Sequence, residues 1–265
     1  MVFINEVIDD NFGFSAKSAK EAVPIEVVKA ANDFRRVKSK LKAAGLARNA
    51  NMSLLDVGCG IGTFLQQAEQ DGWKVAGLEL SPSVAVFARE HNGLQVDSFS
   101  IESDTSFSPG SFDVITMFGV IEHLANPSGA IKECTRLLRP NGILILQTPA
   151  EDGLIRRAGR FLYWASGGLV NFHVMQLYQM RGGHSVCFNR RSMRTLLADH
   201  GLQVVSVEQS TYGFRILLHR FKNLPLFMKL VHIIGTLFIF SLGWILGRSN
   251  HMTVYAQKPH KAVLI

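Results

Sequence analysis

The stretch "LLDVGCGIGTF", Leu54 to Phe64, decides the fold of this 265-residue chain. Its apolar start predicts a buried β-strand, and Asp56 leads that strand into glycines at every second position, Gly58, Gly60 and Gly62. Glycine permits positive φ and lets a ligand approach the backbone closely, and the helix expected next presents free N–H groups. The turn therefore predicts a bound ligand at the end of the strand.

The acids near this turn indicate what kind of ligand binds. Glu79 follows the second predicted strand, about 20 residues after the turn, where an acid can accept both hydroxyls of a ribose. Thr63 occupies the place of the third glycine of the dinucleotide-binding pattern. A phosphate would sit poorly beside Asp56, whereas a cationic amino-acid group would sit well.

Strands and helices alternate outward from this stretch, which specifies a parallel sheet with helices on both faces. We expect an α/β fold: a doubly wound, Rossmann-like sheet of seven strands, mostly parallel, with an antiparallel last strand and helical inserts. The strands are predicted at 53–59, 74–80, 94–99, 112–118, 143–149, 202–208 and 252–258. The helices are predicted at 25–44, 63–70, 82–91, 126–138 and 190–200.

Composition limits the class of protein. Apolar residues make up 47% of the chain, which excludes global disorder, and the three cysteines are too scattered for a disulfide framework or metal cluster. The acidic N-terminus has no pattern of a secretory signal, so we expect a cytoplasmic protein. The net charge of +7 suits an acidic membrane surface or an anionic cofactor, and does not require nucleic acid.

Several motifs follow in an order that is similar to a known family. "LLDVGCGIGTF" resembles motif I of the class I S-adenosylmethionine-dependent methyltransferases. "GLELSPS", "FDVITMFGVIEHLANP" and "LLRPNGILILQTP" resemble their later motifs, and "HSVCFNRRSMRTLLADHGLQVVSVE" and "MTVYAQK" resemble their closing elements. The resemblance covers about Ser53 to Lys258 and is nearest the branch that includes ubiquinone-biosynthesis O-methyltransferases. It implies S-adenosylmethionine as cofactor.

The resemblance also implies roles for individual residues. The methionine part of the cofactor would be surrounded by the turn residues Asp56, Gly58, Cys59, Gly60 and Gly62. Glu79 would hold the ribose hydroxyls, and Phe118, at the end of the fourth strand, would line the methionine side.

The adenine end carries one departure from the family. The resemblance places the adenine between Leu80 and Ile101. Relatives often have an acid just before the second of these positions, to contact the adenine amine, and here Ser100 stands there. A hydroxyl bonds more weakly than a charged group. An arginine of the N-terminal helix closes the site in many relatives, so Arg35 or Arg36 could do so here, the alternative being a solvated helix face.

Two histidines are candidate catalytic residues, because a hydroxyl nucleophile benefits from a base with a pKa near neutral. His123 follows the fourth strand at the edge where ligands bind, and His184 precedes the last core helix. The alternative for each is a structural histidine. The resemblance also implies a possible divalent-metal site, because some quinone O-methyltransferases of the branch hold an ion with acids around such a Glu-His pair, here Glu122 and His123. Gly119 stands where the resemblance calls for a further acid, so no essential metal is predicted.

The sequence divides into an N-terminal helical segment, 1–48, and a methyltransferase domain, 49–265, with inserts at 151–183 and 222–248. In the first insert an apolar stripe lies beside Arg156, Arg157 and Arg160, which is typical of a membrane-surface helix or of a lid over the substrate.

The second insert contains an apolar run, Leu230 to Gly247, without Asp, Glu, Lys or Arg. As a helix it would be about 27 Å long, close to the thickness of a bilayer core. A single crossing would separate two strands of one sheet, so the run must turn back or lie flat. We therefore expect peripheral membrane contact through 224–248, on the cytoplasmic face of the membrane. The alternatives are a helical cover for the substrate pocket or a subunit interface.

These observations predict a methyltransferase, acting by O-methylation on a small hydrophobic or lipid-linked acceptor. One alternative is methylation of a soluble sugar, polysaccharide or secondary metabolite, and another is a non-catalytic binding protein. The intact turn and Glu79 weigh against the last of these. No nucleic-acid partner is expected, and the sequence leaves open the acceptor, the choice among O-, C- and N-methylation, and the oligomeric state.

Overall fold

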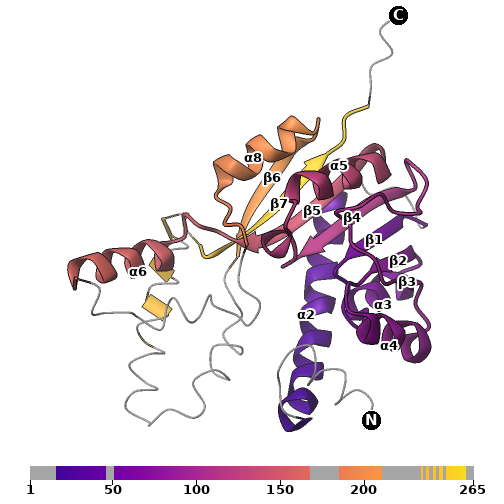
Figure 1. Ribbon diagram of the computed structural model, residues 1–265, viewed down its shortest axis with the longest axis horizontal. Helices are drawn as coiled ribbons and strands as arrows, with labels where there is room; N and C mark the ends of the chain where they lie inside the picture. Colours follow the sequence, from indigo (N-terminus) through magenta and orange to yellow (C-terminus); the bar gives the residue numbers. More distant parts are fainter. Residues whose placement is uncertain are drawn as a thin grey trace, which may run out of the picture.

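The computed structural model describes residues 16–45, 51–167, 185–210 and 249–260, together with scattered positions between 234 and 246. Figure 1 shows a single twisted sheet flanked by helices. Seven strands lie in the order β3-β2-β1-β4-β5-β7-β6. The order reverses direction beside β1, which creates the topological switch point where α/β proteins bind ligands.

The element bounds follow the predicted alternation. The strands are β1 (Ser53–Val57), β2 (Lys74–Leu78), β3 (Val96–Asp97), β4 (Phe112–Phe118), β5 (Leu138–Pro149), β6 (Gln203–Ser210) and β7 (His251–Gln257). The helices are α2 (Ala16–Ala43), α3 (Thr63–Gln70), α4 (Pro82–Asn92), the 3-10 turn η1 (Ile121–His123), α5 (Pro127–Leu137), α6 (Leu154–Ala165) and α8 (Arg190–Asp199).

The pairing of the strands confirms the expected fold class. β1 pairs in parallel with β2 and β4, and β4 pairs in parallel with β5. β7 runs antiparallel to both of its neighbours, β5 and β6. The carboxyl ends of the parallel strands therefore share an edge with the start of β7, and residues far apart in the chain meet there.

Each face of the sheet has its own apolar core. On one face α2 and α3 pack on the sheet, with Phe34 and Phe64 in one cluster with Leu54, Ile143 and Tyr255. On the other face α5 and α8 cover Ile115, Leu144 and Val254 (Figure 1). The side chains of the central strand β4 are buried on both faces of the sheet. This agrees with its nearly continuous apolar sequence, which is typical of a strand covered on both sides.

Three elements differ from the sequence prediction, and one of them is β5, which begins at Leu138 rather than at Ile143. The first helix begins at Ala16 rather than near Ile25, and it continues through Pro24. Ala, Lys and Glu before the proline favour helix, and one proline removes only one backbone hydrogen bond. The strand predicted at 94–99 is only Val96–Asp97, because β3 is an edge strand that pairs with β2 alone.

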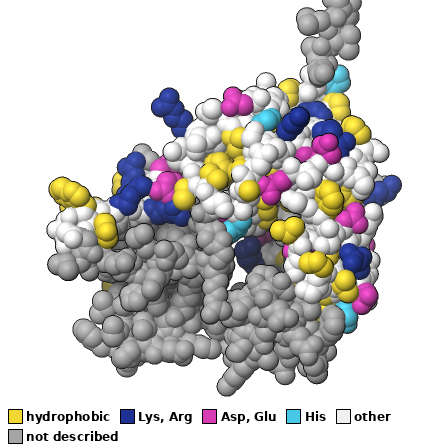
Figure 2. Space-filling model, in the orientation of Figure 1, with side chains coloured by type: hydrophobic (Ala, Val, Ile, Leu, Met, Phe, Trp, Pro, Cys, Tyr) yellow, Lys and Arg dark blue, Asp and Glu magenta, His cyan; other side chains and the backbone are white. Residues whose placement is uncertain are grey.

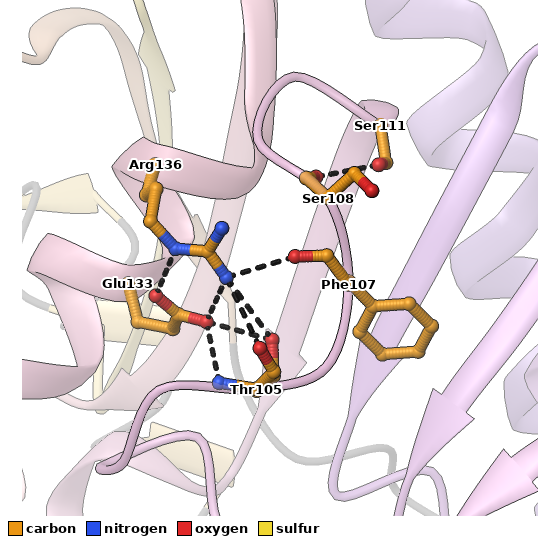
Figure 3. Close-up of polar contacts among 6 residues, drawn as sticks. All are labelled: Thr105, Phe107, Ser108, Ser111, Glu133 and Arg136. Carbon is orange, nitrogen blue, oxygen red and sulfur yellow. Dashed lines mark hydrogen bonds and ion pairs between the residues drawn. The ribbon is translucent and has the colours of Figure 1, made fainter.

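A partly buried ion pair fixes the loop between β3 and β4 to α5 (Figure 3). Glu133, on α5, accepts the backbone N–H and the hydroxyl of Thr105 at 2.8 and 2.7 Å. Arg136 donates to the same carboxylate at 2.6 Å and to the carbonyl of Phe107 at 2.9 Å. These donors lower the pKa of Glu133, although burial of the carboxylate acts to raise it. The same bonds hold the loop against α5 after it leaves the edge of the sheet where ligands bind.

Helix α6 extends away from the sheet beyond the end of β5 (Figure 1). Figure 2 shows basic side chains where α6 joins the sheet and apolar ones at its outer end. Within the described parts of the chain, no helix combines the length and the apolar character that a membrane crossing needs. Most of the apolar run Leu230–Gly247 lies outside the described residues.

Candidate cofactor and acceptor site

The glycine turn lies at the carboxyl end of β1, and two of its three glycines are also required because a side chain there would clash. All three have positive φ, at +71° for Gly58, +56° for Gly60 and +84° for Gly62. A side chain on Gly58 would lie 2.4 Å from Val120, and one on Gly62 would lie 2.1 Å from Leu94. At Gly60 an added Cβ would meet nothing within 4 Å. Gly60 therefore leaves its backbone open to a ligand.

Glu79 is connected directly to this turn. Its carboxylate accepts the N–H of Gly60 at 2.9 Å through one oxygen and the N–H of Ser81 at 2.9 Å through the other. A carboxylate offers about four lone-pair positions, so two bonds leave about two positions for further donors. The half-buried Glu79 can thus accept two hydroxyls while it holds the turn. The sequence placed Glu79 at this edge, and the structure brings it against the turn.

Asp56 lies beneath the turn in a dry environment. It is 4% exposed and accepts a 2.6 Å hydrogen bond from the hydroxyl of Thr116, its register partner on β4. Burial raises the pKa of Asp56 to about 7, and the bond from Thr116 opposes that shift. A cation beside Asp56 would favour the ionised carboxylate, which suits an ammonium group. The sequence did not reveal Thr116, because it lies within an apolar strand 60 positions away.

Cys59 is part of the turn but is not a reactive thiol. Its side chain is buried, and a side chain on Gly77 would lie only 2.6 Å from its sulfur. Burial is the main cause that raises the pKa of the Cys59 thiol. Cys59 therefore fills space between β1 and β2, and its backbone is bonded within the turn, since its N–H donates to the carbonyl of Leu78 and its carbonyl accepts the N–H of Gly62.

The predicted adenine residues lie at the edge of the site formed by β2 and β3. Leu80 is 71% exposed, so its apolar side chain is available for stacking. Ile101 is only 2% exposed and belongs to the apolar core. Ser100 is half-buried and bonds to Glu102 at 3.3 Å.

Phe118 ends β4 on the face covered by α2 and α3. Its ring packs edge-on against Phe64 of α3, with the centroids 5.1 Å apart. In the register of the sheet, Phe118 lies beside Gln147 of β5, which lies beside Thr253 of β7. Phe118 thus stands between the glycine turn and the polar residues of β5 and β7.

The two residues of the Glu-His pair in η1 have different environments. Glu122 is buried, and its carboxylate accepts the hydroxyl of Thr148 at 2.9 Å. Burial raises the pKa of Glu122, more than this hydrogen bond lowers it. His123 is exposed, and its position after β4 places it at the ligand edge. The sequence signalled Glu122 only as a possible metal ligand, and its contact with Thr148 depends on the pairing of β4 with β5.

His184 lies outside the described residues, and the residues that follow it bond to the backbone of this pair. The N–H groups of Ser185 and Val186 donate to the backbone carbonyl of Glu122, at 2.8 and 3.1 Å. Among the described residues, no group of three or more His, Cys, Asp or Glu side chains could hold a metal ion.

Arg36 of α2 has a structural partner. It donates to Glu208 of β6 at 2.8 Å and to Thr253 at 3.0 Å, while Arg35 is exposed. Lys40, one turn further along α2, pairs with the other oxygen of Glu208 at 2.7 Å. These bonds fasten α2 to the antiparallel end of the sheet, so the arginine that the sequence offered as a closing residue holds the helix in place.

Comparison with known proteins is consistent with this geometry. Residues 30–207 match the family model described as "Methyltransferase domain". The chain is 38% identical over 104 residues to a ubiquinone biosynthesis O-methyltransferase of Xanthomonas euvesicatoria pv. vesicatoria, over 37% of this chain and 44% of that relative. The match therefore spans less than half of the length of that relative.

Two further similarities extend over more of the chain. A ubiquinone biosynthesis O-methyltransferase of Pseudomonas paraeruginosa is 36% identical over 177 residues, which cover 64% of this chain and 71% of the relative. The solved structure of a SAM-dependent methyltransferase from Archaeoglobus fulgidus has a TM-score of 0.52 at 15% identity, over 85% of this chain and 94% of that chain. At that identity the structural likeness concerns the fold.

Proposed function

Because the chain belongs to the methyltransferase domain family, we propose that it transfers a methyl group from S-adenosylmethionine to a hydroxyl of a small hydrophobic or lipid-linked acceptor. The observation that carries this proposal is the bond between Glu79 and Gly60, which joins a ribose-binding acid to an open glycine turn. The similarity to O-methyltransferases favours oxygen as the methyl acceptor.

The residues at the switch point fit this cofactor. Gly60 leaves room for a ligand against the backbone, and Glu79 keeps about two acceptor positions for ribose hydroxyls. Asp56 lies on the side where the ammonium of a methionine group would be neutralised, and Leu80 offers an apolar surface for the base. When bound, the cofactor supplies an electrophilic methyl group. The chain aligns the acceptor with it and excludes water.

His123 is our candidate for the group that accepts the proton of the acceptor hydroxyl. It is exposed at the carboxyl edge, and the buried Glu122 beside it anchors η1 through Thr148. His184 is the second candidate. Removal of a general base typically lowers the rate 10²–10⁴-fold. We therefore expect such a loss in either His123→Ala or His184→Ala, whereas turnover within a few-fold of wild type in both would show that alignment alone carries the reaction.

The acceptor can be identified directly. Wild-type protein should be incubated with labelled S-adenosylmethionine and a lipid extract, and the products separated and analysed by mass spectrometry. We expect label in an amphiphilic phenol or lipid-linked product, and none with Glu79→Ala. Label that appears only in water-soluble sugars or metabolites would contradict the hydrophobic acceptor.

We also propose that the surface formed by α6 and the second insert contacts a membrane, from which an amphiphilic acceptor would reach the site. Support comes from the outer end of α6, where Phe161 is 62% and Trp164 78% exposed, and from exposed apolar positions such as Phe238 in the second insert. The arginines of α6 are less available to bind anionic lipid headgroups than the sequence suggests, because Arg156 and Arg160 both pair with Glu151. Apolar contact therefore contributes more than charge.

Liposome flotation tests the membrane contact. Phe161 and Trp164 are exposed, so replacing both with Ser should leave the fold intact and reduce flotation several-fold. Val205→Ser is the matched control, because this exposed side chain lies on β6. If wild-type protein ignores liposomes, the apolar residues instead belong to a lid or a subunit interface.

A further inference from the structure

The end of α4 is bonded to the glycine turn, far away in the sequence. Asn92, the last residue of α4, donates from its side-chain amide to the carbonyl of Ile61 at 2.7 Å, across 31 positions of the chain. Gly93 follows with a φ of +67°, and Leu94 lies so close that a side chain on Gly62 would be 2.1 Å from it. The end of α4 therefore holds the second half of the turn.

The direction of the peptide group between Ile61 and Gly62 is not fixed by these two residues themselves. Glycine adopts positive and negative φ about equally readily, so Gly62 permits this peptide plane to rotate. Two hydrogen bonds select the observed direction, in which the φ of Gly62 is +84°. The N–H of Gly62 donates to the carbonyl of Cys59 at 2.9 Å. The carbonyl of Ile61, on the opposite side of the same trans peptide, is held by Asn92.

Asn92 and Glu79 therefore brace the turn on either side of the peptide group between Gly60 and Ile61. Glu79 holds the peptide group before it, through the N–H of Gly60 at 2.9 Å, and Asn92 holds the peptide group after it. Within the described parts of the chain, the N–H of Ile61 makes no hydrogen bond, so the middle peptide group keeps a donor for a ligand. Its direction depends on both braces, because a peptide plane that rotates on one side changes the backbone of its neighbour.

We propose that Asn92 is a positioning residue for this turn: by holding the carbonyl of Ile61, it keeps the turn in the shape that binds the cofactor. The inference rests on the proposed function, in which the turn binds S-adenosylmethionine. Cofactor affinity then depends on a side chain of α4 that belongs neither to the glycine motif nor to the acids beside it. Asn92 is half-buried and polar, so its replacement removes little apolar packing.

Titration calorimetry with S-adenosylhomocysteine measures this dependence by binding alone. Asn92→Leu has a similar size but no donor, and Asn92→Asp keeps the shape but turns a carboxylate toward the carbonyl of Ile61. We expect the affinity to fall about fivefold or more in each, the value of one hydrogen bond. Asn92→Gln retains an amide donor and should bind more tightly than either. Glu90→Ala, on the exposed side of α4, is the matched control and should bind as wild type.

Amide hydrogen exchange, followed by NMR, separates positioning from general stability. The N–H of Gly62 is bonded to Cys59 and should exchange slowly in the wild type. In Asn92→Leu it should exchange faster, because the peptide group can rotate, while the amides of β4 keep their wild-type protection. Bound S-adenosylhomocysteine should slow the exchange of Gly62 in the wild type and restore its protection in the variant, since the ligand selects the same shape of the turn.

The possible results separate this proposal from the proposed function. Affinity close to wild type in both Asn92→Leu and Asn92→Asp would overturn the positioning role and leave the cofactor site in place. A loss of affinity with faster exchange throughout β4 would also overturn it, because Asn92 would then only stabilise the fold. If neither variant folds, an exchange rate of Gly62 that does not change when the wild type binds the ligand would overturn it. Failure of the wild type to bind S-adenosylhomocysteine would overturn both proposals.

Discussion

The carboxylate of Glu79 accepts the backbone N–H of Gly60 at 2.9 Å, across 19 positions of the chain. The acid that ends the second strand therefore braces the turn that ends the first. One side chain holds the loop in its open shape and, in the proposed function, binds the ribose, so the loss of Glu79 should affect both the turn and the ligand.

Replacing Glu79 should reduce cofactor affinity strongly. Glu79→Ala removes two charge-assisted hydrogen bonds to ribose and the brace on Gly60, so we expect binding of S-adenosylhomocysteine to weaken at least about hundredfold. Glu79→Gln should lose less, because its amide oxygen still accepts one bond. Titration calorimetry measures both, and affinity close to wild type in the alanine variant would show that the ribose lies elsewhere.

Cofactor binding should depend on pH through Asp56. Burial raises the pKa of this carboxyl to about 7, and a bound ammonium would favour its ionised form. Binding at pH 6 should therefore release a proton, and affinity should rise between pH 6 and pH 8. Calorimetry in buffers of different ionisation enthalpy counts the proton. Asp56→Asn should remove this linkage, and a proton release that persists in that variant would assign it to another group.

Glu122 should affect stability differently when it is neutralised and when it is truncated. Its folded-state pKa is raised by burial, so its ionised form destabilises the fold as pH rises above the ordinary range of a glutamate. Glu122→Gln keeps an acceptor for Thr148 and should gain stability relative to wild type from pH 5 to pH 8. Glu122→Ala leaves the Thr148 hydroxyl unpaired and should cost about 1–3 kcal/mol. Urea unfolding measures both, and equal losses in the two variants would contradict the assigned role of the Thr148 bond.

The clamp between α2 and β6 should stabilise the protein only where Glu208 is ionised. The donors Lys40 and Arg36 lower its pKa, despite partial burial, so its contribution is present above the ordinary pKa of a glutamate and is lost as pH falls through the lowered value. Because the partners are partly exposed, Glu208→Gln should cost only about 1–2 kcal/mol at pH 7 and less near pH 3. Glu69→Gln, on the exposed side of α3, is the control for urea unfolding. A loss independent of pH would exclude the ion pairs as its cause.

Much of the fold was predictable because its signals are local. The glycine turn, the helix predicted at 126–138 and the apolar runs of β4 and β5 each specify an element within a few residues, and each of these elements is present. The start of α2 was not predictable, because nothing in the sequence near Pro24 shows whether the proline lies in the first turn of a helix or in its interior. The predicted roles of His123 and His184 remain predictions, since they depend on an acceptor.

The sequence by itself determined the order of strands and helices, the ligand edge and the acids that lie there. Periodicity and turn chemistry act over a few residues and can be read without a structure. Only the tertiary structure decided which side chains meet: Asp56 with Thr116 across 60 positions, and Arg36 with Glu208 across 172. Such contacts depend on strand register and on how a helix packs across the sheet, and a shift of one residue in a strand would turn its side chains to the opposite face.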